Sequence, residues 1–464
     1  MHEPPSPSLR RYWVLAGAVL MQLCLGATYA WSVFVAPLKG LSGLTQGTVQ
    51  APFTLFYIVF PATMVGAGAL VERFGPRPLA VLGGLLFGGG WMVAGLGASH
   101  FAWTVAGVGL LGGLGVGCAY LVPIATCVRW FPARPGLVTG LAVAGFGGGA
   151  ALVTQVSSRL MQSHGATPFD ALRALGLCFA VLVSGAGLLM WEPQHVRRGR
   201  VVAAQASGPA DPVPGPDATP ARPSPFPWLY SSMAAGLAAG LAVNANLKEL
   251  LPGSVPAVGA AAVSLFALAN AIGRIAWGAL FDRLRSTAPL QANLVLQAAV
   301  LMAYPLLKQT PSGFYVLALA AGLNYGGVLV LYAAAVNAYY GPQRMPCVYG
   351  RLFSANIVAS GAPMLAGFAF ERWGTFTPPL LGIAVLLGCV VLVNRGGCRR
   401  SGEGAPPAAA KQGLRWPYFS SPPAQRRQPS MCCRNQSWCH RSSGWPRPLY
   451  MTRPLPYEWH QARA

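Results

Sequence analysis

Charged side chains are scarce in this sequence, and acidic ones are the scarcest. Only 9% of the 464 residues are charged and only 11 are Asp or Glu, while 54% are hydrophobic. A soluble protein of this length carries roughly 25% charged residues. The composition therefore excludes a soluble globular protein and predicts an all-α polytopic membrane protein.

Long runs without charge recur along the chain, each near the ~20 apolar residues that a membrane helix needs. We predict twelve spans, at 12–34, 51–71, 78–98, 101–126, 137–161, 171–191, 227–246, 255–281, 290–307, 313–337, 352–370 and 378–393. No Asp, Glu or His falls within the core of a predicted span. A membrane-embedded enzyme would need paired carboxylates, a nucleophile or metal ligands there, so we expect no enzyme, no metal and no cofactor.

Cysteines do not indicate disulfides, although there are 10 of them. They lie in predicted spans or on the side predicted to be cytoplasmic, where thiols stay reduced. Cys432, Cys433, Cys439 and His440 lie close together in sequence. Their spacing matches no common zinc site.

Positive charge is abundant but unevenly distributed. Of the 33 Lys and Arg, six (Lys39, Arg159, Arg173, Lys248, Lys308 and Arg372) fall on one side of the predicted membrane, one lies inside it, and the rest fall on the other side. This asymmetry follows the positive-inside rule and predicts that both termini are cytoplasmic. The net charge of +22 thus indicates a bilayer partner and not nucleic acid.

The same pattern divides the chain into five segments. We predict a cytoplasmic N-terminus (1–11), a six-helix bundle (12–191), a cytoplasmic linker (192–226), a second six-helix bundle (227–394) and a disordered basic tail (395–464). We expect a monomer in the plasma membrane, or in the inner membrane if the source is bacterial.

Arg274 is the cation inside the predicted membrane, within the apolar stretch 265–285. A charge at that depth costs about 2.5–3.5 kcal/mol on insertion scales and usually faces a water-filled or substrate-filled cavity. We therefore predict an anion site. The alternatives are an Arg satisfied by helix carbonyls or one whose side chain snorkels to the surface.

A short motif occurs twice, and the two copies are 210 residues apart. Gly68, Glu72 and Arg73 in the first copy correspond to Gly278, Asp282 and Arg283 in the second; Gly75 and Arg77 complete the first copy, and we expect Gly75 to reverse the chain. Each copy follows the second helix of a six-helix set. The chain is therefore predicted to be a duplication.

This repeated motif resembles the loop signature of the major facilitator superfamily, G-x-L-x-D/E-R-x-G-x-R/K. The resemblance implies a twelve-helix carrier in which these eight residues form gating loops. Glu72 stands where Asp is commoner, and the second copy lacks the Gly before its last Arg. That departure predicts a looser turn in the second copy.

A narrower resemblance is to the oxalate–formate antiporter family and the related monocarboxylate transporters. The segments YAWSVF (29–34), YLVPI (120–124), the Gly-rich 136–150, NAIGR (270–274) and NYGG (324–327) carry it. It implies that substrate contacts come from Arg274 with Tyr29, Tyr120, Tyr325, Asn270 and Asn356. For these tyrosines, the alternative is simple packing.

Two departures from the relatives refine the expected substrate. Asn356 stands where the antiporters of dicarboxylates have a Lys, so one buried cation favours a monoanion. Asn270 stands where proton-coupled monocarboxylate transporters have an Asp, which argues against their route of proton symport.

We therefore expect a secondary active transporter of small organic anions, chiefly monocarboxylates, that works by alternating access as an exchanger. The alternatives are an oxalate/dicarboxylate–formate antiporter, a proton-coupled monocarboxylate carrier, and a transporter-like sensor whose output is the basic tail.

Overall fold

The computed structural model describes residues 9–163, 165–193, 224–247, 249–251 and 256–400. All of them fall within one compact unit, Met1–Ser420. Most of the predicted linker, nearly all of the predicted tail and the first eight residues lie outside the described residues. Every regular element in the described ranges is helical, in agreement with the predicted fold class.

The first half holds α1 (Arg10–Leu25), η1 (Gly26–Trp31), α2 (Ser32–Ser42), α3 (Gln46–Phe74), α4 (Pro76–Ala94), η2 (Gly95–Ala98), α5 (Ala102–Thr104), the π-helical η3 (Val105–Gly112), α6 (Gly113–Ala119), α7 (Leu121–Trp130), α8 (Pro135–Ser163) and α9 (Pro168–Leu188). The second half holds α11 (Phe226–Asn246), α12 (Pro256–Leu284), α13 (Ala288–Leu307), α14 (Pro311–Leu352), α15 (Ala355–Ala359), α16 (Gly361–Trp373) and α17 (Thr377–Arg400). The last helix thus continues past residue 394, where we predicted the final bundle to end.

Threonine side chains cap three of the long helices. Thr45 and Thr310 accept hydrogen bonds from the backbone N–H three residues later, at the starts of α3 and α14. Thr167 and Asp170 form a reciprocal capping box at the start of α9. Such caps satisfy N–H groups that have no partner within the helix and fix where it begins.

Eleven helices in the described residues are long and apolar enough to cross a membrane. One of them, Pro311–Trp373, has 63 residues and runs through α14, α15 and α16. At about 1.5 Å per residue it would be far longer than a ~30 Å bilayer core. Its backbone leaves the helical region at Gly341 (φ 77°, ψ 164°), so it contains two of the predicted spans, 313–337 and 352–370. The eleven helices therefore account for the twelve predicted crossings.

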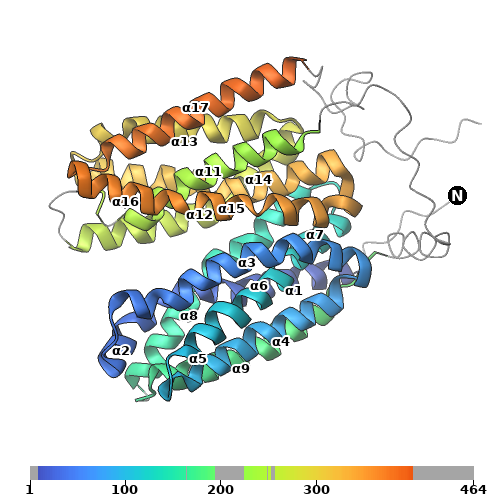
Figure 1. The fold of residues 1–464 in the computed structure, drawn as a ribbon. Helices are drawn as coiled ribbons and strands as arrows, with labels where there is room; N and C mark the ends of the chain where they lie inside the picture. Colours follow the sequence, from blue (N-terminus) through green and yellow to red (C-terminus); the bar gives the residue numbers. More distant parts are fainter. Residues whose placement is uncertain (1–8, 164, 194–223, 248, 252–255, 401–464) are drawn as a thin grey trace, which may run out of the picture. The chain divides into compact units, whose positions relative to one another are not determined.

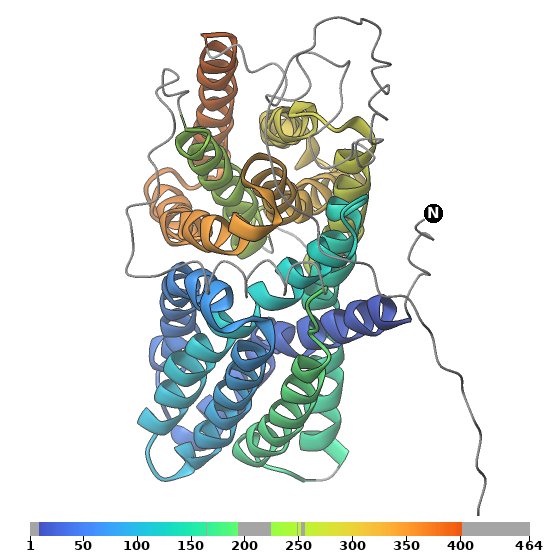
Figure 2. The ribbon, with the colours of Figure 1, turned by 90° about the vertical axis from the view of Figure 1, so that its right-hand side faces the viewer.

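Figures 1 and 2 both show the helices coloured blue to green in one group and those coloured yellow-green to orange in another. The two groups meet mainly through two helix pairs, α12 with α8 and α14 with α3. Glycines allow this close approach. A Cβ atom added at Gly136 would overlap the carbonyl of Gly278, and one added at Gly68 would overlap the carbonyl of Pro346.

These contacts repeat with the spacing of the motif. Adding 210 to the positions of Gly68 and Gly136 gives Gly278 and Pro346. The contact between Gly68 and Pro346 therefore corresponds to the contact between Gly278 and Gly136. The geometry agrees with a duplicated chain whose halves contact each other through equivalent helices.

The two motif copies end in related turns. Gly75 adopts φ 88° after α3, which confirms the predicted reversal. In the second copy the corresponding residue is Arg285, and it also has a positive φ, of 48°. The second copy thus retains a positive-φ turn although it lacks the glycine that normally favours one.

Candidate functional site

Arg274 lies on α12 and is 2% exposed, so its guanidinium does not reach the surface. Its Nη1 donates a hydrogen bond to the backbone carbonyl of Val143 on α8, across the two halves. Its Nε is buried and has no hydrogen-bond partner among the described residues. The protein therefore satisfies part of this guanidinium and leaves another part without an acceptor.

Aromatic rings surround this region. The ring of Phe146 lies edge-on to Tyr29 (5.0 Å between centroids) and to Tyr120 (5.3 Å). Tyr29 also stacks on Tyr57 at 6.1 Å. These residues come from η1, α3, α8 and the junction between α6 and α7, so four separate segments of the first half line the space.

Five phenols belong to one electrostatic group with Arg274. The charge of Arg274 acts on the hydroxyls of Tyr57, Tyr120, Tyr325 and Tyr349, and the hydroxyl of Tyr29 interacts with the first three. The hydroxyl of Tyr349 already donates to the carbonyl of Leu329. We call Tyr29, Tyr57, Tyr120 and Tyr325 the phenol shell. Tyr325 comes from α14, so the shell receives groups from both halves.

Unsatisfied hydrogen-bond donors collect here. Besides Arg274 Nε, the amide nitrogen of Asn270 and the hydroxyl of Tyr120 are buried without a hydrogen-bond partner in the described part of the chain. Leaving a buried polar group unsatisfied costs about 1–3 kcal/mol. A site with surplus donors and a fixed positive charge suits a ligand that is negatively charged and rich in acceptor oxygens.

The described ion pairs do not neutralise Arg274. They join Arg129 to Glu192 and Arg173 to Asp170. In the described ranges the side chain of Glu192 is also buried (8% exposed), but it pairs with Arg129 and not with Arg274. Nor do the described residues contain a group of three His, Cys, Asp or Glu that could hold a metal ion.

Five of the six predicted substrate residues therefore lie in or beside one region: Arg274, Asn270, Tyr29, Tyr120 and Tyr325. The sixth, Asn356 on α15, uses its amide to donate to the carbonyl of Phe353 (3.1 Å). Phe353 in turn packs against Tyr120 at 5.5 Å between centroids. Asn356 is thus linked to the phenol shell through a neighbour, and no described contact joins it to Arg274.

Tyr57 is the member of the phenol shell that sequence reasoning missed. A signal was present, because Phe53, Phe56, Tyr57 and Phe60 recur at helical spacing in the second predicted span. Such spacing places several rings on neighbouring faces of one helix.

The second copy of the repeated motif joins the two halves. The carboxylate of Asp282, near the end of α12, accepts hydrogen bonds from the backbone N–H groups of Gly136 (2.8 Å) and Leu137 (2.7 Å). These residues belong to the first turn of α8, where N–H groups lack helical partners and the helix dipole favours an anion. We call this contact the Asp282 clasp.

Replacing Asp282 with Asn is expected to weaken the clasp, because a neutral amide accepts more weakly and its NH2 group faces other donors. Hydrogen bonds to charged groups contribute about 1.5–3 kcal/mol each. We expect maleimide to label a cysteine introduced at Leu137 roughly tenfold faster in D282N. The control is D170N, which changes an Asp that caps α9 and whose described hydrogen bonds and ion pair join it to Thr167 and Arg173 of its own half. An unchanged labelling rate in D282N would show that the clasp does not hold the halves together.

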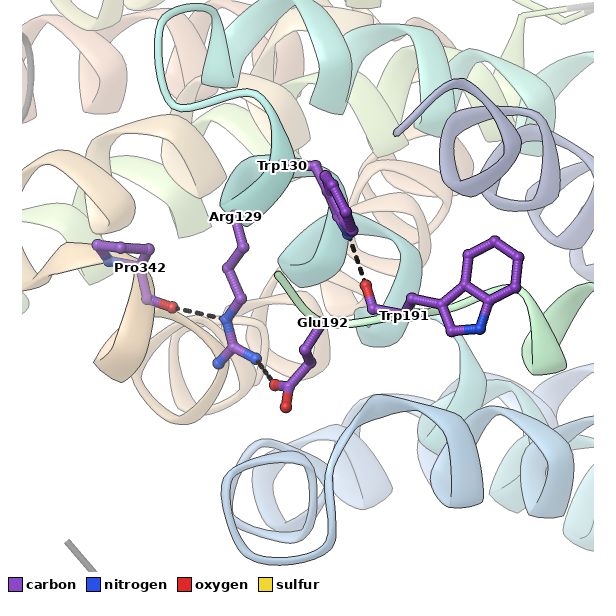
Figure 3. A network of polar contacts seen from close by, with 5 residues as sticks. All are labelled: Arg129, Trp130, Trp191, Glu192 and Pro342. Carbon is purple, nitrogen blue, oxygen red and sulfur yellow. Dashed lines mark hydrogen bonds and ion pairs between the residues drawn. The ribbon is translucent and has the colours of Figure 1, made fainter. Parts of the chain in front are cut away.

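A second polar connection surrounds Arg129, one of the Lys and Arg that the charge distribution assigns to the cytoplasmic side. It is buried: Nη1 pairs with Glu192 Oε1 at 2.5 Å, and Nε donates to the carbonyl of Pro342 at 3.2 Å (Figure 3). The neighbouring indole of Trp130 donates to the carbonyl of Trp191. Trp191 and Glu192, where the predicted linker begins, are therefore bound to α7. Through Arg129, α7 is in turn bound to the bend of α14 at Gly341 and Pro342.

Removing the carboxylate of this buried pair is expected to destabilise the protein. E192Q replaces the charged partner of a buried guanidinium with a neutral amide, and removing one member of a buried ion pair typically costs about 3 kcal/mol or more. R173Q is the matched control, because its pair with Asp170 is about half exposed and such pairs contribute roughly 0–1 kcal/mol. Thermal unfolding in detergent should show a clearly lower midpoint for E192Q and little change for R173Q. Equal decreases in the two midpoints would show that burial does not make the Arg129–Glu192 pair more important for stability.

Comparison with known proteins adds to this geometry. The profile of the Major Facilitator Superfamily matches residues 16–362. The oxalate:formate antiporter of Oxalobacter formigenes is 25% identical over 405 residues, covering 83% of this chain and 92% of that protein. Apicoplast pyruvate carrier 1 of Toxoplasma gondii is also 25% identical, covering 78% of this chain and 83% of that protein.

A solved structure supports the fold. The fucose:proton symporter FucP of E. coli superimposes with a TM-score of 0.59 over 84% of this chain and 99% of that one, at 14% sequence identity. At an identity this low, the similarity shows the arrangement of the helices and carries no information about the substrate.

Proposed function

Because the chain belongs to the Major Facilitator Superfamily, we propose that this membrane transporter carries small monocarboxylates and exchanges one for another by alternating access. The substrate lies between the two halves, next to Arg274 and the phenol shell. Both halves contribute to this site, so their relative movement exposes it to one side of the membrane and then to the other.

One observation carries this proposal: a buried guanidinium surrounded by donors that have no acceptor. A carboxylate offers about four lone-pair sites and a full negative charge, so it can pair with Arg274 and accept from neighbouring hydroxyls. A neutral sugar would leave the positive charge uncompensated.

The charge count favours a monoanion. In the described ranges the buried cations are Arg129 and Arg274, and Arg129 already pairs with Glu192. A dicarboxylate at the site would therefore bring two negative charges to one available cation. The second charge would be buried without a partner, at a cost of several kcal/mol.

Exchange follows from the same charge and from the lack of acids around it. In the described part of the chain, no interaction links Arg274 to an Asp, Glu or His that could relay a proton, and the buried carboxylate of Glu192 already pairs with Arg129. A carrier that closes empty must enclose an uncompensated guanidinium, whereas the loaded form is neutralised. The relatives named an oxalate:formate antiporter and a pyruvate carrier give independent support for carboxylates.

The predicted topology remains part of this proposal. Bundles at 12–191 and 227–394 would be joined by a cytoplasmic linker, with both termini in the cytoplasm, and the protein would act as a monomer in the plasma or inner membrane.

A transport panel tests the proposal. Purified protein in liposomes, preloaded with unlabelled formate or pyruvate, is given labelled formate, acetate, pyruvate, lactate, oxalate or fucose outside. We expect saturable uptake of one or more monocarboxylates and little uptake of oxalate or fucose. Uptake of fucose alone, or of none of the six, would contradict the proposal.

A further inference from the structure

A pocket lies at one end of the second half, where α11 and α13 begin and α17 approaches its end. The three helices pack against one another and lie side by side in Figure 1. With its mouth included, the pocket encloses about 330 Å³. Its apolar lining consists of Trp228, which is partly buried, and of the nearly fully buried Leu290, Leu294 and Val391. A hydrocarbon chain therefore finds apolar walls on all three helices.

Polar side chains line the same pocket, mostly nearer the helix ends. Thr287 and Gln291 lie one helical turn apart at the start of α13, and Thr287 is about 10 Å along the helix from the apolar Leu294. Asn394, in the last turns of α17, donates through Nδ2 to Ser232 Oγ at 2.6 Å. The side chains of Thr287 and Gln291 have no hydrogen-bond partner among the described residues. Both can donate to a ligand oxygen.

Arginines flank the pocket on two sides. Two precede α13 and three stand in the last turns of α17: Arg283, Arg285, Arg395, Arg399 and Arg400. The acids beside them are Asp282, whose carboxylate is bound in the Asp282 clasp, and Glu403, which lies outside the described residues. This end of the second half is therefore strongly basic. Basic pockets between membrane helices attract anionic lipid headgroups.

We propose that this pocket binds an anionic phospholipid. An acyl chain lies against Leu294 and Val391, and the headgroup phosphate accepts hydrogen bonds from Thr287 and Gln291 while the arginines compensate its charge. Trp228 stands at the level of the headgroup, where amphipathic indole rings are common. The lining residues belong to neither α12 nor the phenol shell, so this lipid is a partner distinct from the transported substrate.

The two-part lining favours a lipid over other anions. A free phosphate ion would use the polar edge and leave the apolar depth unfilled. Phosphatidylcholine would fill the apolar depth, but its ammonium group would meet a basic rim. An anionic phospholipid suits both parts of the pocket.

Two pairs of variants test the pocket and its charge separately. Q291W places an indole in the pocket, whereas Q309W places one at an exposed position just beyond the other end of α13. R395Q/R399Q/R400Q removes the three arginines of α17. Its control removes three exposed arginines of α1 and α14, which the charge distribution assigns to the same side of the membrane: R10Q/R344Q/R351Q.

The measurement is native mass spectrometry of the delipidated full chain in detergent, titrated with phosphatidylglycerol, phosphatidylcholine or inorganic phosphate. We expect wild type to bind phosphatidylglycerol at least about tenfold more tightly than phosphatidylcholine, and to bind no inorganic phosphate over the same range. Q291W should weaken phosphatidylglycerol binding at least about tenfold, because the indole and the lipid compete for the same space. R395Q/R399Q/R400Q should weaken it by a similar factor, and both controls should bind as wild type does.

Equal affinity of wild type for the two lipids would overturn the proposal. Equal binding by Q291W and Q309W, or by the two triple variants, would do the same. Phosphate binding as tight as that of phosphatidylglycerol would show an ion site and not a lipid site. If Q291W does not fold, the triple variants decide, because they change residues outside the pocket lining. The readout is lipid binding and not transport, so the result does not depend on the substrate proposed for Arg274.

Discussion

Replacing Arg274 with Gln is expected to reduce monocarboxylate exchange at least about 100-fold. The guanidinium gives the substrate a full opposite charge and up to two charge-assisted hydrogen bonds, each contributing about 1.5–3 kcal/mol. Every 1.36 kcal/mol is tenfold in rate. The buried position of Arg274 strengthens the effect, because solvent does not screen the interaction there.

Two further variants show that the loss is specific. R351Q removes an exposed Arg of α14 and should exchange at close to the normal rate. R274K keeps the charge but loses the planar pair of donors, so its activity should fall between those of wild type and R274Q. If R274Q is folded and exchanges normally, no anion binds at Arg274.

External substrate is expected to accelerate the release of preloaded labelled substrate by about 100-fold over release into buffer. Release into buffer requires the empty carrier to return with a buried guanidinium that lacks a counter-anion, at a cost of several kcal/mol. The hydrogen bond from Arg274 to the Val143 carbonyl offsets part of this cost. It supplies a dipole and no negative charge, so we expect slow net flux and fast exchange.

This result is measured by counterflow in liposomes, with release followed in the presence and absence of external unlabelled acid. Formate, pyruvate and lactate serve as external acids, and oxalate tests the preference for monoanions. Equal release with and without external acid would rule out obligatory exchange. A release that instead follows an imposed pH gradient would favour proton coupling and contradict anion exchange.

Much of the fold could be predicted from the sequence because membrane helices follow from local composition. The low charge content predicted the spans, and the motif that begins at Gly68 and again at Gly278 predicted the duplication. Gly75 has the positive φ that its place in the motif implies. These features depend on residues close together in sequence.

The contacts between the halves were less predictable. Arg129 looked like one of many charges at a membrane surface, yet it pairs with Glu192, 63 residues away. Whether such a charge is solvated or buried depends on which distant segment packs over it. Asp282 was predicted to belong to a gating loop, which stays a prediction, but its partner, the first turn of α8, could not be predicted from the motif.

The candidate site was predictable in part. Arg274 stood out because a charge in an apolar run is costly and rare, and resemblance pointed to Tyr29, Tyr120 and Tyr325. Tyr57 was missed because an aromatic residue in an apolar helix looks like ordinary packing. We also considered that helix carbonyls satisfy Arg274. This holds for Nη1, which donates to the carbonyl of Val143, but not for Nε, which has no partner among the described residues.

The most direct test of the central claim is equilibrium binding of labelled pyruvate to purified wild type and R274Q, with R351Q as the control. The account predicts saturable binding to wild type and R351Q, competed by formate or lactate, and no saturable binding to folded R274Q over the same concentration range. Equal affinity of wild type and R274Q for pyruvate would contradict it.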